Sequence, residues 1–167
     1  MSKDINISMN TKSINDAIKE LQRLESDFVR KLDIFVRVLA NDGVSVARTW
    51  ISAGAGTERN ATVSYNVGSD GDIKFAQIHM SGEDALFIEF GAGYFYNPED
   101  PPHAADYGMG VGTYPGQTHA FNNGWWYYDD AGYATYTHGT EGTYPMYHAA
   151  ETIRNSAIKT ALQIFRS

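Results

Sequence analysis

Apolar residues recur at spacings of three and four near the start of the chain, and this periodicity constrains the fold more than any other feature. The spacing forms one apolar stripe on an α-helix, and Ser13 followed by Asp16 is typical of a helix start. We therefore predict an amphipathic helix over residues 13–40 with one buried face. The stripe comprises Ile14, Ala17, Ile18, Leu21, Leu24, Phe28, Leu32, Phe35, Val38 and Leu39.

Gly43 could end this helix, because glycine is favoured just past a helix C-terminus. Helical spacing nevertheless resumes after it, at Val44, Ala47, Trp50 and Ile51. We therefore predict a kinked continuation of the helix to about residue 52.

The next part of the chain has the alternation of β-strands. Residues 62–67 alternate polar and apolar side chains, and a loop with glycine and aspartate separates them from a second apolar segment at 73–80. The apolar phase of this second segment switches between Phe75 and Ile78, which predicts a β-bulge. With the apolar run 85–90 as a third strand, the pattern predicts an antiparallel meander.

Residues 91–145 differ in composition from everything before them. This segment holds ten of the sixteen glycines, nine of the eleven tyrosines and all five prolines. It shows no helical period, so loops and short strands are expected, and its many aromatic side chains favour an ordered segment. We predict an aromatic, glycine-rich insertion within a single domain that spans residues 1–167.

A second helix closes the chain. Pro145 precedes an apolar face with helical spacing, and Arg154, Lys159 and Arg166 lie toward its C-terminal half, where cations favour the helix dipole. The order of elements predicts an α+β fold. In it, a small antiparallel sheet is packed by the long N-terminal helix and the C-terminal helix, with the insertion at 91–145.

The distribution of charge argues against several classes of function. Residues 75–153 contain no Lys or Arg and ten Asp or Glu, so this section is a poor partner for phosphate backbones. The polar start lacks the apolar run of a signal peptide, and no apolar stretch has the length of a membrane span. We expect a soluble protein made in a cytoplasm, with no specific nucleic-acid binding and no membrane association.

Side chains that could perform chemistry are present but lack the spacing that known sites require. The five histidines, at 79, 103, 119, 138 and 148, show no metal-ligand spacing. The adjacent acid pairs at 99–100 and 129–130 would point to opposite sides of a strand, so neither suits glycosidic catalysis. The Gly91-Ala92-Gly93 sequence is too short to be a nucleotide fingerprint, and there is no nucleophile elbow. We therefore expect no enzyme activity, no cofactor and no metal. A glycoside-cleaving enzyme is a remaining rival, and it would need two carboxylates about 5–10 Å apart across a cleft.

The aromatic residues of the insertion allow three interpretations. They include Trp125, Trp126, Tyr127 and Tyr128 in succession. They can form a satellite core under the long loop, a protein interface, because Tyr and Trp are enriched at binding hot spots, or a platform on which sugars stack. The sequence leaves all three open.

The order of segments resembles the head–tail joining, or tail-completion, family of long-tailed phages. The resemblance rests on the long helix from Ser13, the Ile88-Glu89-Phe90-Gly91-Ala92-Gly93 motif, the Gly139-Thr140 pair after an aromatic insertion, and the Pro145-Met146-Tyr147-His148-Ala149 entry to the last helix. Ala92 replaces the family's usual Thr, and Gly54 to Asn60 stands where the family often has a Pro and a Thr-Gly-x-Leu run.

The resemblance implies a structural virion protein of the phage neck, located in the virion and, during assembly, in the host cytoplasm. Its partners would be further copies of itself in a ring and neighbouring head or tail proteins. An acidic middle section could line a channel through which DNA slides. A carbohydrate- or surface-binding module that uses the aromatic acidic loop is the alternative. The candidate interface residues are Glu89, Phe90, Gly91, Gly93, Tyr94, Tyr96, Trp125, Trp126, Tyr127 and Tyr128.

Overall fold

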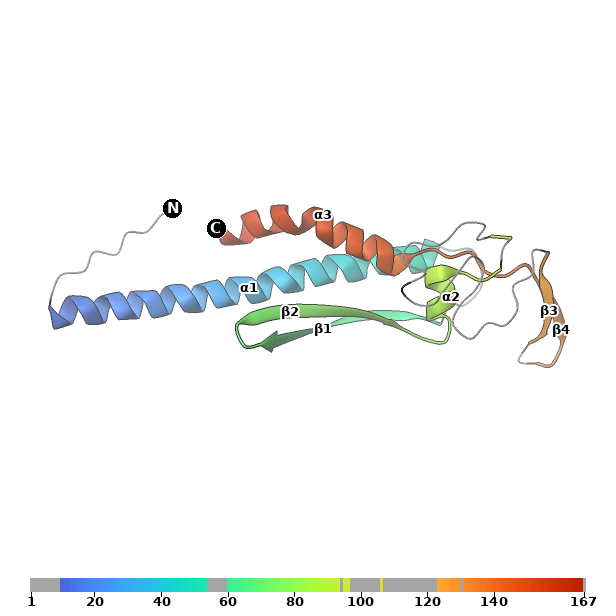
Figure 1. Ribbon diagram of the computed structural model, residues 1–167, viewed down its shortest axis with the longest axis horizontal. Helices are drawn as coiled ribbons and strands as arrows, with labels where there is room; N and C mark the ends of the chain where they lie inside the picture. The colour runs from blue at the N-terminus through green and yellow to red at the C-terminus, as the bar shows by residue number, and fades with distance from the viewer. Residues whose placement is uncertain are drawn as a thin grey trace.

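The fold is α+β, as predicted, and its order of elements is helix, hairpin, short helix, hairpin, helix (Figure 1). A computed structural model describes residues 10–53, 60–93, 95–96, 106, 123–129 and 131–166. The elements are α1 (Thr11–Ala53), β1 (Thr62–Asp70), β2 (Ile73–Ser81), α2 (Ala85–Phe90), β3 (Trp125–Tyr128), β4 (Ala134–Thr137) and α3 (Pro145–Phe165).

The long N-terminal helix α1 confirms the predicted periodicity. It begins after Asn10, whose side-chain oxygen accepts a hydrogen bond from the Ser13 backbone N–H at 2.9 Å. Asn10 therefore caps the helix, and the prediction that Ser13 does so was wrong. The helix runs unbroken through Gly43. A side chain at that position would meet the tips of Ile153 and Ile78, so the glycine permits close packing instead of ending the helix.

The two-stranded sheet of β1 and β2 forms an unbroken antiparallel hairpin. Its register runs from Thr62 opposite Ser81 to Asp70 opposite Ile73 without an extra residue on either strand, so the predicted bulge is absent. The change of apolar phase has another cause. Phe75 lies opposite Gly68, and its ring fills the space that a side chain on that glycine would need.

The apolar run 85–90 is the short helix α2, and the predicted third strand was wrong. The helix starts at the preceding turn, where the Ile88 N–H donates a helical hydrogen bond to the Asp84 carbonyl at 2.8 Å. Asp84 also anchors the turn, since its carboxylate accepts a hydrogen bond from the Asn60 backbone N–H at 2.8 Å. The meander is therefore a single hairpin followed by a helix.

The main core lies around the C-terminal half of α1. Helix α3 runs antiparallel to α1 on one side, and the β1–β2 hairpin lies along α1 on another (Figure 1). The buried centre of the core consists of Val44, Ala47, Val63 and Ala149. This arrangement confirms that the two long helices pack the small sheet.

The N-terminal half of α1 extends beyond its neighbours, and here the prediction of a buried face was wrong. Helix α3 ends near Phe28 and Phe35, whose rings lie 5.6 Å and 6.1 Å from the ring of Phe165. Beyond that point Ala17 is buried, but the large side chains of the stripe stay exposed, and Leu21 retains 54% of its accessible surface. The other large exposed side chains of this part are Ile14, Ile18, Leu24 and Phe28.

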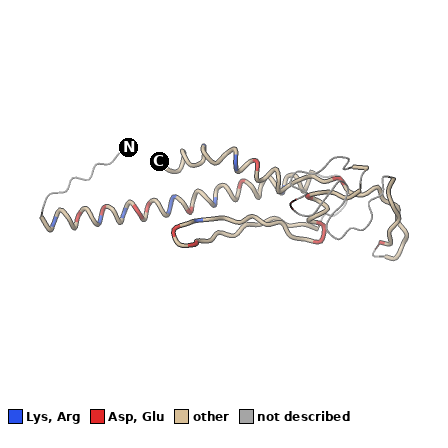
Figure 2. The backbone as a smooth tube through the Cα atoms, viewed as in Figure 1, with Lys and Arg blue, Asp and Glu red and all other residues tan. Residues whose placement is uncertain are grey.

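Charged side chains are concentrated on α1, which carries cations and anions interspersed (Figure 2). Two ion pairs join residues four apart on this helix, with Lys31 3.4 Å from Asp27 and Arg37 2.7 Å from Asp33. Among the described residues, no helix has a stretch long and apolar enough to cross a membrane.

Candidate interaction site

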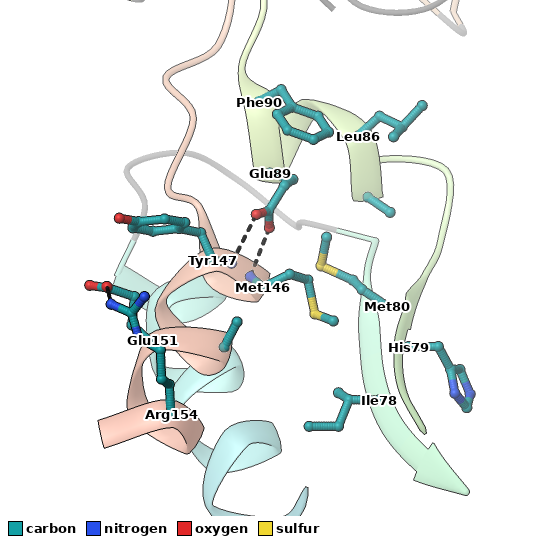
Figure 3. Close-up of a pocket in the computed structure, with 12 residues that line it drawn as sticks. Ile78, His79, Met80, Leu86, Glu89, Phe90, Met146, Tyr147, Glu151 and Arg154 are labelled. Atoms are coloured by element: carbon teal, nitrogen blue, oxygen red, sulfur yellow. Dashed lines mark hydrogen bonds and ion pairs between the residues drawn. The ribbon is translucent and has the colours of Figure 1, made fainter. Parts of the chain in front are cut away.

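The carboxylate of Glu89 joins helix α2 to the start of helix α3. It accepts hydrogen bonds from the backbone N–H groups of Met146, at 2.8 Å, and Tyr147, at 3.1 Å (Figure 3). The first N–H groups of any helix have no partner within the helix. The residue before α3, Tyr144, adopts a left-handed conformation and its side chain does not accept a hydrogen bond from these N–H groups. Glu89 therefore caps α3 from a distant part of the chain.

Burial and the helix terminus act on Glu89 in opposite directions. Glu89 is buried, and desolvation raises the pKa of its carboxyl above the ordinary value. The two N–H bonds from Met146 and Tyr147 favour the charged form and oppose that rise without cancelling it. The backbone reinforces the junction, because the Thr143 N–H donates to the Ile88 carbonyl at 2.8 Å.

The two ends of the insertion are joined beside Glu89. Ala92 and Thr140 form an antiparallel bridge with two backbone hydrogen bonds of 2.8 Å. Close approach requires glycine here, since Gly139 has φ +98° and a side chain on it would collide with the Ala92 carbonyl. The insertion thus leaves and rejoins the body at one point, which we call the stem (residues 88–93 and 138–147).

A groove opens beside the stem, between β2, α2 and the first turns of α3 (Figure 3). Its volume is about 670 Å³. The side chains of Met80 and Met146 point into the space between β2 and α3 (Figure 3), while Leu86 and Phe90 line it from α2. Flexible methionine side chains suit a surface that adapts to what it contacts.

The strands β3 and β4 form an aromatic arm, defined as residues 123–129 and 131–138. They pair antiparallel with Trp126 opposite Tyr136 and Tyr128 opposite Ala134, and the arm extends beyond the body (Figure 1). Side chains alternate across a strand, so Trp126, Tyr128 and Tyr136 share one face. The rings of Trp126 and Tyr136 are 5.3 Å apart, and Tyr128 keeps 79% of its surface exposed.

The turn of the aromatic arm is built by Asp129. Its carboxylate accepts hydrogen bonds from the backbone N–H groups of Ala131 and Tyr133, at 3.1 Å and 2.9 Å, and from the Thr135 hydroxyl at 3.3 Å. The Tyr136 hydroxyl donates to the Asn123 carbonyl at the other end of the arm. The rings are thus presented on a hydrogen-bonded frame.

The residues predicted as an interface fall into two groups. Glu89, Phe90, Gly91 and Gly93 are buried and form the stem, whereas Tyr96, Trp126, Tyr127 and Tyr128 are exposed. Trp125 is half-buried, and the site of a side chain on Gly93 would lie 3.0 Å from its ring. Tyr94 lies outside the described residues. The structure therefore brings Glu89, Phe90, Gly91 and Gly93 together in the stem that carries the arm, and it exposes the aromatic residues of the arm to solvent.

The described part of the chain holds no cluster of His, Asp and Glu that could bind a metal ion. His79 is hydrogen-bonded to the Ser64 hydroxyl at 2.8 Å, and the ring of His148 stacks on Trp50 at 3.8 Å. His138 packs between the rings of Phe95 and Tyr136. His103, His119, Glu99, Asp100 and Asp130 lie outside the described residues.

Two features were missed in the sequence. The groove residues Met80 and Met146 are far apart in the chain, and no local pattern links them. The exposure of half of the α1 stripe could have been predicted from the lengths of the two helices. The predicted helix over 13–40, with its continuation, is much longer than the predicted C-terminal helix, so the C-terminal helix alone cannot cover it. No model of a protein family, no curated protein and no solved structure matches this chain.

Proposed function

We propose that the chain is a structural virion protein of the neck of a tailed phage, where it joins head and tail as a connector or tail-completion ring component. It acts without catalysis, cofactor or metal. Its partners are further copies of itself and neighbouring head or tail proteins. It is located in the virion, after assembly in the host cytoplasm.

The aromatic arm is the observation that carries this proposal. Its strands make no extensive contact with any other described helix or strand. The arm nevertheless presents Trp126, Tyr128 and Tyr133, each with more than two thirds of its surface exposed. Trp and Tyr supply most of the binding energy in many interfaces. Large aromatic surfaces held out from a folded body favour a binding role over a role in the protein's own core.

The stem supports the same proposal, because it brings three of the resembling motifs into contact. Glu89 binds the Pro145-Met146-Tyr147 entry to α3, and Ala92 pairs with Thr140. These motifs anchor the arm on the body at one point. An anchored projection is suited to reaching a neighbouring subunit in an assembly.

The proposal is tested by altering the arm in the phage or prophage that encodes this chain. The gene is inactivated and complemented with the wild type, with the double variant W126A/Y128A, or with a control variant, Ser69→Ala, at an exposed site on the β1–β2 hairpin. Electron microscopy of the lysates should show separate DNA-filled heads and unattached tails for the inactivated gene and for the arm variant, and joined particles for the wild type and the control. Intact, infectious particles with the arm variant, or a joined phenotype with the gene inactive, would overturn the proposal.

A carbohydrate-binding module is the second candidate, and one observation favours it. Trp126, Tyr128 and Tyr136 lie on the same face of the arm, as rings must lie to stack against a sugar. Saturable quenching of tryptophan fluorescence by cell-surface oligosaccharides, lost in Trp126→Ala, would support this function. In that case phage particles with the arm variant would be intact but would fail to bind cells.

Asp129 is unsuited as a probe of an acidic DNA channel, because its carboxylate builds the turn of the arm. Replacing it with Lys would disturb the arm itself. Glu141, an exposed acid of the same cation-free section, is the better position. If this section lines a channel, Glu141→Lys should slow DNA ejection while leaving particles joined.

A further inference from the structure

The bare stripe of α1 is an apolar surface whose large side chains the described fold leaves exposed, while Ala17 within it is buried. We define it as the exposed apolar side chains between Ile14 and Phe28. It continues the seam in which Phe28 and Phe35 contact Phe165 of α3. A solvated helix normally turns only polar residues outward. The stripe therefore has the chemistry of an interior surface but lies where none of the described helices covers its large side chains.

Helix α3 has the complementary surface on its outer side. Ile158 keeps 76% and Leu162 keeps 42% of its surface exposed. These residues are four apart and so lie on one ridge of the helix, away from Thr160, which is buried against the body. Two apolar helical surfaces at different places on one chain can cover each other between two copies.

The lengths of the two surfaces match. Residues 11–27 of α1, which reach past α3, span about 26 Å, and the 21 residues of α3 span about 32 Å, both from the rise of an α-helix. A second copy can therefore place its α3 over the bare stripe, end to end with the first copy's α3. A two-fold rotation that does so also lays the second copy's bare stripe on the outer ridge of the first copy's α3.

Beside the two surfaces lie charged side chains of opposite sign that can pair with each other. Lys159 is next to Ile158, Arg166 follows α3, and in the described part of the chain neither forms an ion pair closer than 4 Å. Glu25 lies on the flank of the bare stripe, exposed and likewise without such a pair. Glu25 beside the stripe and the two cations beside the ridge can pair across the contact, which favours a stripe-to-ridge arrangement.

We propose that two copies of this chain form a two-fold dimer in which the bare stripe of each α1 covers the outer ridge of the other copy's α3. The interface is isologous, because each copy contributes the same two surfaces. The dimer therefore contains two identical contacts, each between the bare stripe of one copy and the outer ridge of the other copy's α3. The inference concerns surfaces other than the aromatic arm, so it does not depend on the proposed function.

The dimer is tested first by mass. Light scattering after gel filtration should give twice the chain mass of 18.5 kDa. Leu21→Lys places a cation against the basic ridge, and Ile158→Glu places an acid against the stripe, so each variant should fall to the single mass. Ser26→Lys, on the opposite side of α1, should remain a dimer. Circular dichroism checks that each variant keeps its helices.

Mixing the two monomeric variants gives the sharpest result. A dimer of one Leu21→Lys chain and one Ile158→Glu chain has one wild-type contact and one contact with a Lys–Glu pair. The mixture should therefore regain the double mass, while each variant alone does not. No recovery on mixing, or a single mass for the wild type at every concentration, would overturn the proposal.

Cysteine pairs test the geometry, because the chain has no cysteine of its own. The double variant L24C/L162C should form disulfide-linked dimers on oxidation, since both leucines are exposed. A larger closed ring linked by these cysteines would contradict the two-fold arrangement. Coverage of the stripe by residues 1–9 of the same chain would give the single mass and no linked dimer, and would also overturn it.

Discussion

The two halves of α1 carry the same apolar stripe but have different surroundings. In the C-terminal half, Leu39, Val44 and Ala47 are buried under the hairpin and α3. In the N-terminal half, Leu21 and Phe28 each keep 54% of their surface exposed. The comparison shows that periodicity specifies which side of a helix is to be covered. It does not specify what covers it, or whether the cover belongs to the same chain.

The largest expected effect separates the two halves directly. Leu39→Ala leaves a cavity in the covered half and should lower the free energy of unfolding by about 2–5 kcal/mol. Leu21→Ala removes a side chain that is half exposed and should change it by less than about 0.5 kcal/mol in the monomer. Urea unfolding at low protein concentration measures both. Equal losses would show that the bare half is covered within the chain.

The next effect concerns the capping of α3 on the covered half. Glu89→Ala removes both acceptors from the Met146 and Tyr147 N–H groups, so unfolding should become easier by about 1–3 kcal/mol. Glu151→Ala, which breaks an exposed ion pair with Arg154, is the control and should change stability by less than about 0.5 kcal/mol. Similar values for the two variants would refute a capping role for Glu89.

A smaller effect is expected at Gly43, where α1 approaches both of its neighbours. Alanine favours the helix by about 1 kcal/mol over glycine, but its methyl group would come within 2.7 Å of Ile153 and 2.8 Å of Ile78. Overpacking of this kind costs about 1–3 kcal/mol, so Gly43→Ala should give a net loss near 1 kcal/mol. Thermal unfolding beside the exposed control Ser45→Ala measures it. A gain in stability would mean that the core is loose at this point.

The smallest effect is a dependence on pH. Burial raises the pKa of Glu89 above its ordinary value of 4.5. The part of the stability that is linked to its protonation is therefore complete below the unfolded pKa and is lost as pH rises through the folded pKa, while the hydrogen bonds of the capping carboxylate remain. The wild type should therefore lose stability relative to Glu89→Gln between mildly acidic and neutral pH. Urea unfolding of both proteins over that range tests it. A difference that stays constant or grows with pH would contradict the shift.

Short apolar runs mark the limit of what could be predicted. Residues 85–90 fit a buried strand as well as a helix, because six residues are too few for the two periods to differ. The hydrogen bonds of the Asp84 turn decided for helix α2. The predicted bulge was also wrong. The change of apolar phase comes from the pairing of Phe75 with Gly68 across the hairpin, which a single strand's pattern does not show.

The sequence by itself determined the elements whose patterns are local. The spacing of three and four specified α1 and α3, and the alternation at 62–67 specified β1, because these periods follow directly from backbone geometry. Only the tertiary structure decided what Glu89 does, since the N–H groups it binds lie 57 and 58 residues further along the chain. The tertiary structure also decided that α3 ends beside Phe28 of α1 and leaves the large side chains of the bare stripe exposed. Burial depends on where two helices meet and not on the pattern of either one.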